Sequence, residues 1–525
     1  MLHEHLLLII SLLFVVSLLV MLGQKLRVSY PIFLVLSGLL IGLIPGTPHI
    51  DIEPDIIFLV ILPPLLYEAA WYTSWKQFWK FRRAIGLLAL GLVIFTSTIV
   101  AFVSHALIPG FTLALGFLLG GIISPPDAVA ATSVLKGLNI PKRVTTILEG
   151  ESLVNDASSL IVFRFALAAV ASGQFVLVKA IGDFYLVAGM GIVVGLVIGQ
   201  IFYLLHRYLP TTPQIDTGLS LMTPYLMYLT AEEFHFSGVL AVVSGGLFLS
   251  YRSHNFFSYR SRIQTTNVWS TLVFLLNGFV FILIGLQLPA IVEGLEDYSM
   301  KQAIFYGIVI SLLVVVIRMV WVYPATYIPR WISSKVRAKE SKPVFKSVFI
   351  VSWSGMRGVV SLASALSIPL MISKDVAFPQ RNIILFITFV VILFTLVLQG
   401  LTLPLIIKWL NIETGEAALK ESQQEAAVNV HLTQAAMEFL QSKYASELEH
   451  SPALQQLMKR YTAILENATE QVDKSVARHY RKVLVELIDV RRNELNRLRA
   501  EHDYDDEIIR KHEANLDLEE ARLRK

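Results

Sequence analysis

The polar run that decides how this chain folds lies within a long apolar segment and reads Glu149-Gly150-Glu151-Ser152-Leu153-Val154-Asn155-Asp156-Ala157. It brings carboxylate, hydroxyl and amide groups to a depth at which a membrane-spanning helix meets only lipid or protein. A charge at bilayer depth costs at least about 2.5 kcal/mol, so it is normally retained for a functional reason. A helix end that dips into water explains Glu149 in part. It does not explain Asp156, which lies a turn or more deeper.

One face of the expected helix collects the polar side chains of this run. The residues at spacing i, i+3, i+4 and i+7, which share one side of a helix, are Ser152, Asn155, Asp156 and Ser159. They offer oxygen ligands, which hard cations such as sodium prefer. The run therefore predicts a cation site inside the membrane.

Composition places the chain among the polytopic membrane proteins. Of its 525 residues, 55% are hydrophobic and 16% are charged, and the mean hydropathy is +0.62. Soluble domains are usually about 25% charged. The lack of cysteine excludes disulfides and thiolate chemistry, and the net charge of +4 indicates no particular partner. Residues 1–5 contain no Lys or Arg, so we expect the apolar run 6–23 to be a mature span and not a signal peptide.

Apolar runs of about 17–25 residues predict roughly thirteen membrane-spanning helices. Lys and Arg are concentrated in alternate loops, and an odd number of spans places these loops on the side of the C-terminus. The positive-inside rule then predicts a cell-membrane protein with an external N-terminus and a cytoplasmic C-terminus. The expected spans, of which the eighth and ninth are short, are 6–23, 28–46, 52–71, 84–108, 111–135, 146–172, 181–206, 217–232, 237–251, 267–290, 302–328, 344–371 and 382–410.

Two of these spans contain residues that a continuous helix does not tolerate. The fifth contains Ser124-Pro125-Pro126-Asp127, and the twelfth contains Ser354-Gly355-Met356-Arg357-Gly358. Tandem prolines remove two backbone donors, and irregular backbone at this depth occurs only where protein or a cavity surrounds it. The breaks lie seven spans apart, so two six-helix repeats, spans 1–6 and 8–13, would have inverted orientations. Paired broken helices indicate a secondary transporter; two ordinary kinks are the alternative.

The charge pattern changes after Asn411, which predicts two domains. Residues 1–411 would form the membrane domain, whereas residues 412–525 are rich in Glu, Lys, Arg, Ala and Leu. Apolar residues recur at helical spacing in this second region, for example at Val483, Leu487 and Ile488. We expect a cytoplasmic helical region, either a regulatory or dimer-supporting domain or a solvated helical tail.

Five stretches, in this order along the chain, are similar to motifs of one transporter family: Leu62-Pro63-Pro64-Leu65-Leu66-Tyr67-Glu68-Ala69, Asp127-Ala128-Val129-Ala130, the run from Glu149 to Asp156, Gly285-Leu286-Gln287-Leu288-Pro289 and Gly355-Met356-Arg357-Gly358. Over about residues 5–410 the chain resembles the monovalent cation/proton antiporters of family 1, which include the NhaP-type bacterial sodium/proton exchangers. The resemblance implies an all-α polytopic fold with inverted repeats, two broken helices that cross, and a homodimer. It also implies a transporter and not an enzyme.

Individual residues receive roles within this family. Asp156 is expected to be the shared cation ligand and proton carrier, because a proton and a cation compete for one buried carboxylate. By resemblance, Glu68 supplies a second carboxylate, although its place beside Trp71 also suits an interfacial anchor. Ser152 is a candidate hydroxyl ligand that could instead bond back to its own helix. Asn155 would orient the site; in the wider superfamily Asp at this position accompanies charge-moving exchange, so Asn resembles the electroneutral class.

Other polar residues are expected to support this site. Pro126 stands where the family often has a threonine, so it offers a carbonyl but no hydroxyl. Glu151 and Arg357 are expected to form a structural ion pair between the sixth and twelfth spans, with ion binding as a minor alternative. Arg357 is also a candidate to balance negative helix ends at the crossing. Asp127 should meet the positive end of the second half of the broken fifth span, at the helix crossing. The arginines expected to pack or to reach the lipid surface first, and to line a pathway second, are Arg164 and Arg318.

The sequence thus predicts a sodium/proton antiporter that works by alternating access and serves pH and sodium homeostasis. A potassium/proton or broad monovalent cation antiporter is the main alternative, and a non-transporting cation sensor on the same fold is another. A channel would need a continuous polar pore, whereas these polar groups cluster at one depth. A hydrolase would need a base near Ser152, and no histidine lies deep in a span. We expect no nucleic acid and no organic cofactor, because no Gly-rich phosphate loop opens a soluble helix.

Overall fold

The computed structural model describes residues 2–26, 28–45, 56–136, 138, 140–173, 177–295, 298–339, 342–373, 376–411, 415–469, 474–501 and 506–523. The chain divides into two compact units, Met1–Ile412 and Glu413–Lys525. Three parts of the expectations lie outside the described residues. They are the last residue of the second span, 46, the start of the third span, 52–55, and position 412, at which the expected second domain begins.

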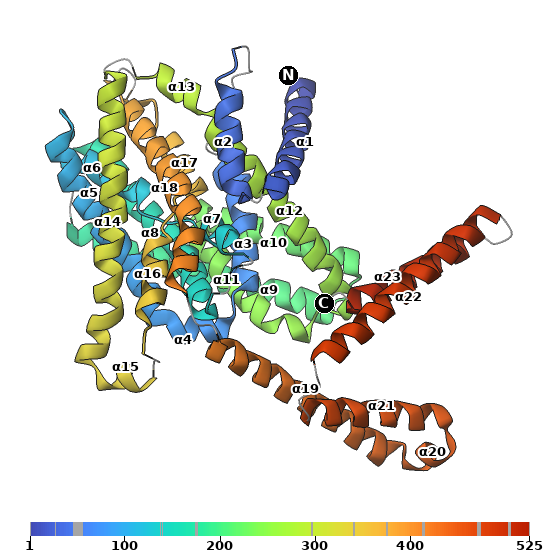
Figure 1. Ribbon diagram of the computed structural model, residues 1–525. Helices are drawn as coiled ribbons and strands as arrows, with labels where there is room; N and C mark the ends of the chain where they lie inside the picture. Colours follow the sequence, from blue (N-terminus) through green and yellow to red (C-terminus); the bar gives the residue numbers. More distant parts are fainter. Residues whose placement is uncertain are drawn as a thin grey trace. The chain divides into compact units, whose positions relative to one another are not determined.

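The first unit is built almost entirely from helices, as Figure 1 shows, and this confirms the predicted all-α membrane fold. Its helices are α1 (Leu2–Leu26), α2 (Tyr30–Gly42), α3 (Leu62–Tyr72), α4 (Trp75–Gly86), α5 (Val93–Leu107), α6 (Leu113–Ile123), α7 (Ala128–Leu135), α8 (Lys142–Ser172), α9 (Leu177–Tyr208), α10 (Pro213–Glu233), α11 (Gly238–Arg252), α12 (Tyr259–Leu286), α13 (Leu288–Glu293), α14 (Met300–Ile332), α15 (Ser334–Lys339), α16 (Phe345–Trp353), α17 (Val359–Leu366) and α18 (Arg381–Leu410). Shorter turns are η1 (Ile56–Ile61) and η2 (Leu87–Leu92), which are π-helical, and the 3-10 turn η3 (Ser253–Asn255).

Eight helical segments among the described residues are long and apolar enough to cross a membrane: Ile9–Leu26, Trp75–Leu107, Leu113–Leu135, Lys142–Ser172, Gly182–Tyr208, Tyr259–Glu293, Met300–Ile332 and Arg381–Leu410. Two shorter apolar helices, Tyr30–Gly42 and Ile57–Tyr72, accompany them. Each segment falls within or around an expected span. The total of thirteen spans and the inverted orientation of the two repeats stay predictions.

A small antiparallel hairpin departs from the otherwise helical unit. Its strands, β1 (Met371–Ser373) and β2 (Val376–Ala377), pair Met371 with Ala377 and Ser373 with Val376. The twelfth span was expected to continue to residue 371, but α17 already ends at Leu366. Pro369 explains the early end, because a proline disfavours helical backbone at the residue before it.

The two predicted helix breaks are present and cross each other. Residues 124–127 separate α6 from α7, and residues 354–358 separate α16 from α17. The Asp127 amide donates to the Met356 carbonyl at 2.7 Å, which joins the two breaks directly. A Cβ on Gly358 would lie 1.9 Å from Asp127 Oδ2, so only glycine permits this approach. The breaks therefore place irregular backbone inside the protein, where it can be satisfied.

The entry into α3 shows how prolines position a candidate site residue. Pro63 and Pro64 lack the N–H groups that would close α-helical bonds to the carbonyls four residues earlier. The preceding turn η1 is π-helical. Pro64 has no N–H to donate to the Val60 carbonyl, and this carbonyl instead accepts a hydrogen bond at 3.0 Å from the Tyr225 hydroxyl on α10. This contact fixes the start of α3, the helix that carries Glu68.

The helices of the first unit pack as two bundles. The core bundle contains α4–α8 with η2, together with α14 and α16–α18; the panel bundle contains α1–α3 and α9–α12. Within the core, α8 packs mainly against α6 and α4; within the panel, α11 packs mainly against α9 and α3. Contacts between the bundles are fewer than contacts within them. The two helix breaks belong to the core, and Glu68 belongs to the panel.

The second unit is helical throughout its described part, as the sequence predicts. It contains α19 (Gly415–Lys443), α20 (Ala445–His450), α21 (Pro452–Thr469), α22 (Lys474–Glu501) and α23 (Asp506–Leu523). Helix α19 packs against α21, and α22 packs against α23. Ile488 and Leu516 are buried within the second pair, and Arg491 and Arg492 form ion pairs at 2.6 Å with Glu519 and Asp517.

Candidate functional site

A cavity of about 330 Å³ lies where the panel bundle meets the broken helix of the core. It is lined by residues of α3, α7, α8, α12 and α17 and of the two helix breaks. Of the residues predicted to bind the cation or to support it, those in its wall are Glu68, Pro126, Asp127, Ser152 and Asp156. Residues distant in sequence thus meet at one point, as the cation-site hypothesis requires. Asn155 lies behind the wall.

Asp156 borders this cavity with no hydrogen-bond donor on its carboxylate among the described residues. The residue is only 8% exposed, because α8 runs through the middle of the core bundle. An ionised carboxylate taken out of water needs a counter-charge, a proton or several donors. Since the neighbouring residues supply no donors, the carboxylate is available to a proton or a cation that enters the cavity.

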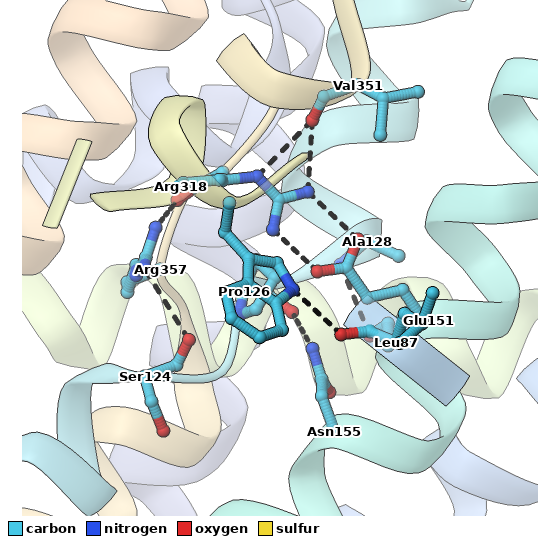
Figure 2. Close-up of polar contacts among 12 residues, drawn as sticks. Leu87, Ser124, Pro126, Ala128, Glu151, Asn155, Arg318, Val351 and Arg357 are labelled. Carbon is cyan, nitrogen blue, oxygen red and sulfur yellow. Dashed lines mark hydrogen bonds and ion pairs between the residues drawn. The ribbon is translucent and has the colours of Figure 1, made fainter. Parts of the chain in front are cut away.

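Asn155 and Ser152 attach α8 to the break between α6 and α7. Asn155 Nδ2 donates to the Pro126 carbonyl at 3.0 Å (Figure 2), and Ser152 Oγ accepts from the Ala128 amide at 3.3 Å. The Asn155 Oδ1 atom is buried without a partner. The Pro126 carbonyl therefore already accepts one hydrogen bond, and only its second lone pair remains for an ion. Asn155 holds the geometry of the break from behind.

Glu68 reaches the same cavity from the panel side. It also lines a second, smaller cavity of about 100 Å³ together with Trp71 and Tyr72. A residue that lines two cavities between helices faces other parts of the protein, whereas an anchor at the membrane surface would face lipid headgroups. The position favours the ligand interpretation of Glu68 over the interfacial one. The two candidate carboxylates, Glu68 and Asp156, thus come from different bundles.

Glu151 forms its ion pair with Arg318 of α14 and not with the predicted partner Arg357. Arg318 Nη1 and Nη2 lie 2.5 and 2.9 Å from the two Glu151 oxygens, and Nε and Nη2 also donate to the Val351 carbonyl of α16 (Figure 2). Both side chains are buried. The planar guanidinium of Arg318 donates a hydrogen bond to each carboxylate oxygen of Glu151. Glu151 is therefore neutralised and hydrogen-bonded without Arg357. Of the two roles expected first for Arg318, packing inside the protein and reaching the lipid surface, the structure shows the packing one.

Arg357 instead closes the end of α6 at the helix crossing. Its Nε and Nη2 donate to the Ile123 and Ser124 carbonyls at 2.9 and 3.4 Å, and Nη1 contacts the Gly355 carbonyl. The guanidinium therefore meets the negative C-terminal end of α6. Asp127 does the opposite for α7, where its Oδ1 accepts from the Val129 amide at 2.7 Å. Opposite charges thus face opposite helix ends.

Arg164 pairs across the two bundles. Its Nη2 lies 2.6 Å from Glu232 Oε2 on α10, and both side chains are partly exposed. Arg164 was expected to pack or to reach the lipid surface, and its pairing with Glu232 was not predicted from the sequence. The signal was weak, because Glu232 lies at the end of an expected span among other acidic residues.

Three polar residues of the cavity wall were not identified from the sequence. Asn277 on α12, Thr132 on α7 and Ser361 on α17 all line the cavity. Asn277 is 3% exposed, and the Ser361 hydroxyl is buried without a partner. An amide in the middle of the apolar span 267–290 was a visible signal for Asn277, whereas the two hydroxyls had none. No group of three or more His, Asp or Glu side chains that could hold a metal ion occurs in the described part of the chain.

Comparisons of sequence identify one protein family. The family model described as "Sodium/hydrogen exchanger, transmembrane" matches residues 10–409. An uncharacterized Na+/H+ exchanger of Mycobacterium tuberculosis is 32% identical over 514 residues, which cover 96% of this chain and 93% of the relative. A sodium, potassium, lithium and rubidium/H+ antiporter of Bacillus pumilus is 34% identical over 388 residues, covering 72% of this chain and 58% of the relative.

Comparison of structures gives the same fold. The sodium proton antiporter of Methanocaldococcus jannaschii, solved at pH 8, aligns with a TM-score of 0.61. The alignment covers 76% of this chain and 99% of the archaeal one, at 21% sequence identity. The archaeal structure therefore supports the helical architecture of the first unit.

Proposed function

Because the chain belongs to the sodium/hydrogen exchanger family, we propose that it exchanges a cytoplasmic monovalent cation, sodium first, for external protons across the cell membrane. The exchange would serve pH and sodium homeostasis. The observation that carries this proposal is the cavity in which the donor-free carboxylate of Asp156 meets Ser152 and Glu68. The predicted orientation, with an external N-terminus and a cytoplasmic C-terminus, and the homodimer implied by the resemblance belong to the same proposal.

Competition at Asp156 performs the exchange. In one direction Asp156 binds the cation with help from the Ser152 hydroxyl and the Glu68 carboxylate, which are oxygen ligands suited to sodium. In the other direction the same carboxylate takes a proton, and the cation leaves. Because one group binds either partner and not both, each crossing of the site carries one or the other. Alternating access then couples the two flows.

The stoichiometry we propose is one cation for one proton. Of the adjacent polar residues Asn155 and Asp156 on α8, only Asp156 is a carboxylate. Asn155 is neutral and already donates a hydrogen bond to the Pro126 carbonyl. Both loaded forms of the site therefore have the same charge. Exchange in proteoliposomes should be independent of membrane potential. A rate that follows an imposed potassium diffusion potential would contradict this stoichiometry.

A broader monovalent cation antiporter is the second candidate. At the helix break this chain has Pro126, which contributes no hydroxyl, and its carbonyl already accepts a bond from Asn155. A site with fewer fixed ligands is less able to separate sodium from potassium by cavity size and ligand number. The name of the Bacillus pumilus relative includes potassium, lithium and rubidium. Both observations favour testing several cations.

The experiment is dequenching of a pH-sensitive dye in everted membrane vesicles after addition of sodium, lithium, potassium or calcium salts. Sodium or lithium should restore fluorescence, and Asp156→Ala should abolish the response at unchanged protein level. Glu486→Ala, which removes an exposed carboxylate from the second unit, is the matched control and should behave as the parent. A response to potassium alone would support the second candidate. Normal exchange by Asp156→Ala would overturn the proposed role of Asp156.

A further inference from the structure

The Arg164–Glu232 ion pair joins two helices that belong to different bundles. Arg164 is on α8 of the core, and Glu232 is on α10 of the panel. Glu232 is also fixed within the panel, because its Oε1 atom accepts from the Gly238 amide at the start of α11, at 3.2 Å. That position at a helix N-terminus suits a carboxylate. The pair is therefore a direct polar bridge between the panel and the core.

The bridge lies on the opposite side of Asp156 from the cavity. The cavity residues of α8 are Glu149, Ser152, Leu153 and Asp156, which all lie at or before the candidate ligand. After it come Ala157 and Leu160, which are buried with Val243 of the panel in an apolar cluster that begins at the cavity wall with Leu66 and Leu153. Arg164 follows two helical turns beyond Asp156, about 12 Å along the axis. An apolar layer and then an ion pair thus close the end away from the cavity.

We propose that the Arg164–Glu232 pair is a gate, closed in this structure, that shuts one entrance to the Asp156 site while the cavity serves the other. This inference rests on the proposed function, because alternating access requires each entrance to close in turn. With the predicted orientation, the cavity faces the cytoplasm and the pair lies at the external entrance. The pair must separate, and α8 must move relative to α10, before Asp156 can meet the external side.

The surroundings of the pair suit a contact that opens at every turnover. The two side chains are 45% and 26% exposed, so the protein encloses neither charge completely. At the external entrance that the predicted orientation gives this pair, water would screen the two charges and weaken their attraction. The buried pair of Arg318 and Glu151 is 0% and 1% exposed and lies within the core bundle. A contact that must break at every turnover is expected at a partly exposed position such as that of Arg164 and Glu232, and not at a fully buried position such as that of Arg318 and Glu151.

The chain contains no cysteine, so a cross-link can test the gate without background. The double variant Arg164→Cys with Glu232→Cys, reconstituted in proteoliposomes, is treated with a bifunctional thiosulfonate reagent, and sodium-driven proton exchange is measured. We expect exchange before treatment, at least a tenfold loss once the link has formed, and recovery after reduction. The control Arg491→Cys with Glu519→Cys replaces an Arg–Glu pair of the same 2.6 Å length in the second unit. Its cross-link should leave exchange unchanged.

Full exchange through completely cross-linked protein would overturn the gate while leaving the proposed antiport intact. A second measurement needs no transport at all. Leu160→Cys lies in the apolar layer, and its labelling by a membrane-impermeant thiol reagent from the external side reports whether that entrance is open. Adding Glu232→Gln, which keeps the shape of the side chain but removes its charge, should accelerate labelling severalfold. An unchanged labelling rate would also reject the gate, whatever the chain transports.

Discussion

Two carboxylates on α8, five residues apart, have opposite surroundings. Both oxygens of Glu151 are held by the guanidinium of Arg318, whereas the Asp156 carboxylate borders a cavity without a donor among the described residues. Five residues turn a helix by about 140°, so one helix directs a paired carboxylate toward one neighbour and an unpaired carboxylate, the candidate ligand, toward the cavity. Burial of a charge alone therefore does not indicate a candidate binding site, because a buried charge such as Glu151 can already have its partner; Asp156 is the candidate because its carboxylate lacks one within the described part of the chain.

The largest contrast is expected between activity and stability in Asp156→Asn. Exchange should fall to the level of vesicles without the protein, because an amide cannot carry a proton or balance a cation. The free energy of unfolding should change by less than about 1 kcal/mol, since no hydrogen bond from the protein is lost. Sodium flux in proteoliposomes and the thermal unfolding midpoint in detergent check the two parts. If Asp156→Asn retained exchange, Asp156 would not be the functional carboxylate, and its contrast with the structural carboxylate Glu151 would no longer hold.

Arg318→Ala should show the reverse behaviour, with a loss of stability of about 3–5 kcal/mol because it leaves Glu151 charged, buried and unpaired. Replacing both partners, as Arg318→Met with Glu151→Met, should recover most of that loss, because two apolar side chains leave no unpaired charge. Thermal unfolding of the purified variants measures both effects. If Arg318→Ala were as stable as the parent, the ion pair of Arg318 and Glu151 would not stabilise the core bundle.

Glu68→Gln should have an intermediate effect, on cation binding and not on folding. We expect exchange to continue with an apparent affinity for sodium about tenfold lower, which corresponds to roughly 1.4 kcal/mol, because one of two carboxylates is neutralised. The measurement is the sodium concentration that gives half-maximal dye response. Glu149→Gln, which also lines the cavity, is the matched comparison and should change this concentration less. Equal effects would place Glu68 outside the site.

Pro126→Thr should produce the smallest effect, a change of preference without loss of exchange. The substitution adds the hydroxyl that the family resemblance leads us to expect beside the ion. One additional ligand of about 0.5–1.5 kcal/mol would favour sodium over potassium by roughly two- to tenfold. The ratio of sodium to potassium responses in the same vesicles measures it. An unchanged ratio would mean that this position does not determine selectivity.

The sequence was sufficient for features set by local chemistry. Tandem prolines and paired glycines predicted both helix breaks, and the i, i+3, i+4 spacing placed Ser152, Asn155 and Asp156 together on α8. Pairings that depend on how helices pack were not accessible in this way. Arg318 and Arg357 both lie within apolar spans, and nothing local to either shows which of them faces Glu151. The packing of α14 and α16 determines the partner, because it places Arg318 within hydrogen-bond distance of both Glu151 and the Val351 carbonyl.

Asn277 illustrates another limit. An amide within an apolar span either satisfies its own helix or faces a partner across the bundle, and spacing along one helix does not separate these cases. In the structure it lines the cavity opposite the core helices. The Arg164–Glu232 bridge was missed for a similar reason, since its two residues lie 68 positions apart in sequence.

The fixed charges around the helix crossing cancel in sets. Glu151 balances Arg318, and the formal charges of Asp127 and Arg357 are equal and opposite. Under the proposed exchange, the set formed by these four side chains and Asp156 is then neutral when Asp156 holds a sodium ion and neutral again when it holds a proton. Only the form with an empty Asp156 leaves a net charge on this set, and moving a charge through a medium of low dielectric constant is costly. In the proposed antiporter, the balance of these four side chains would therefore discourage return of the unloaded protein and would limit leakage of the sodium gradient.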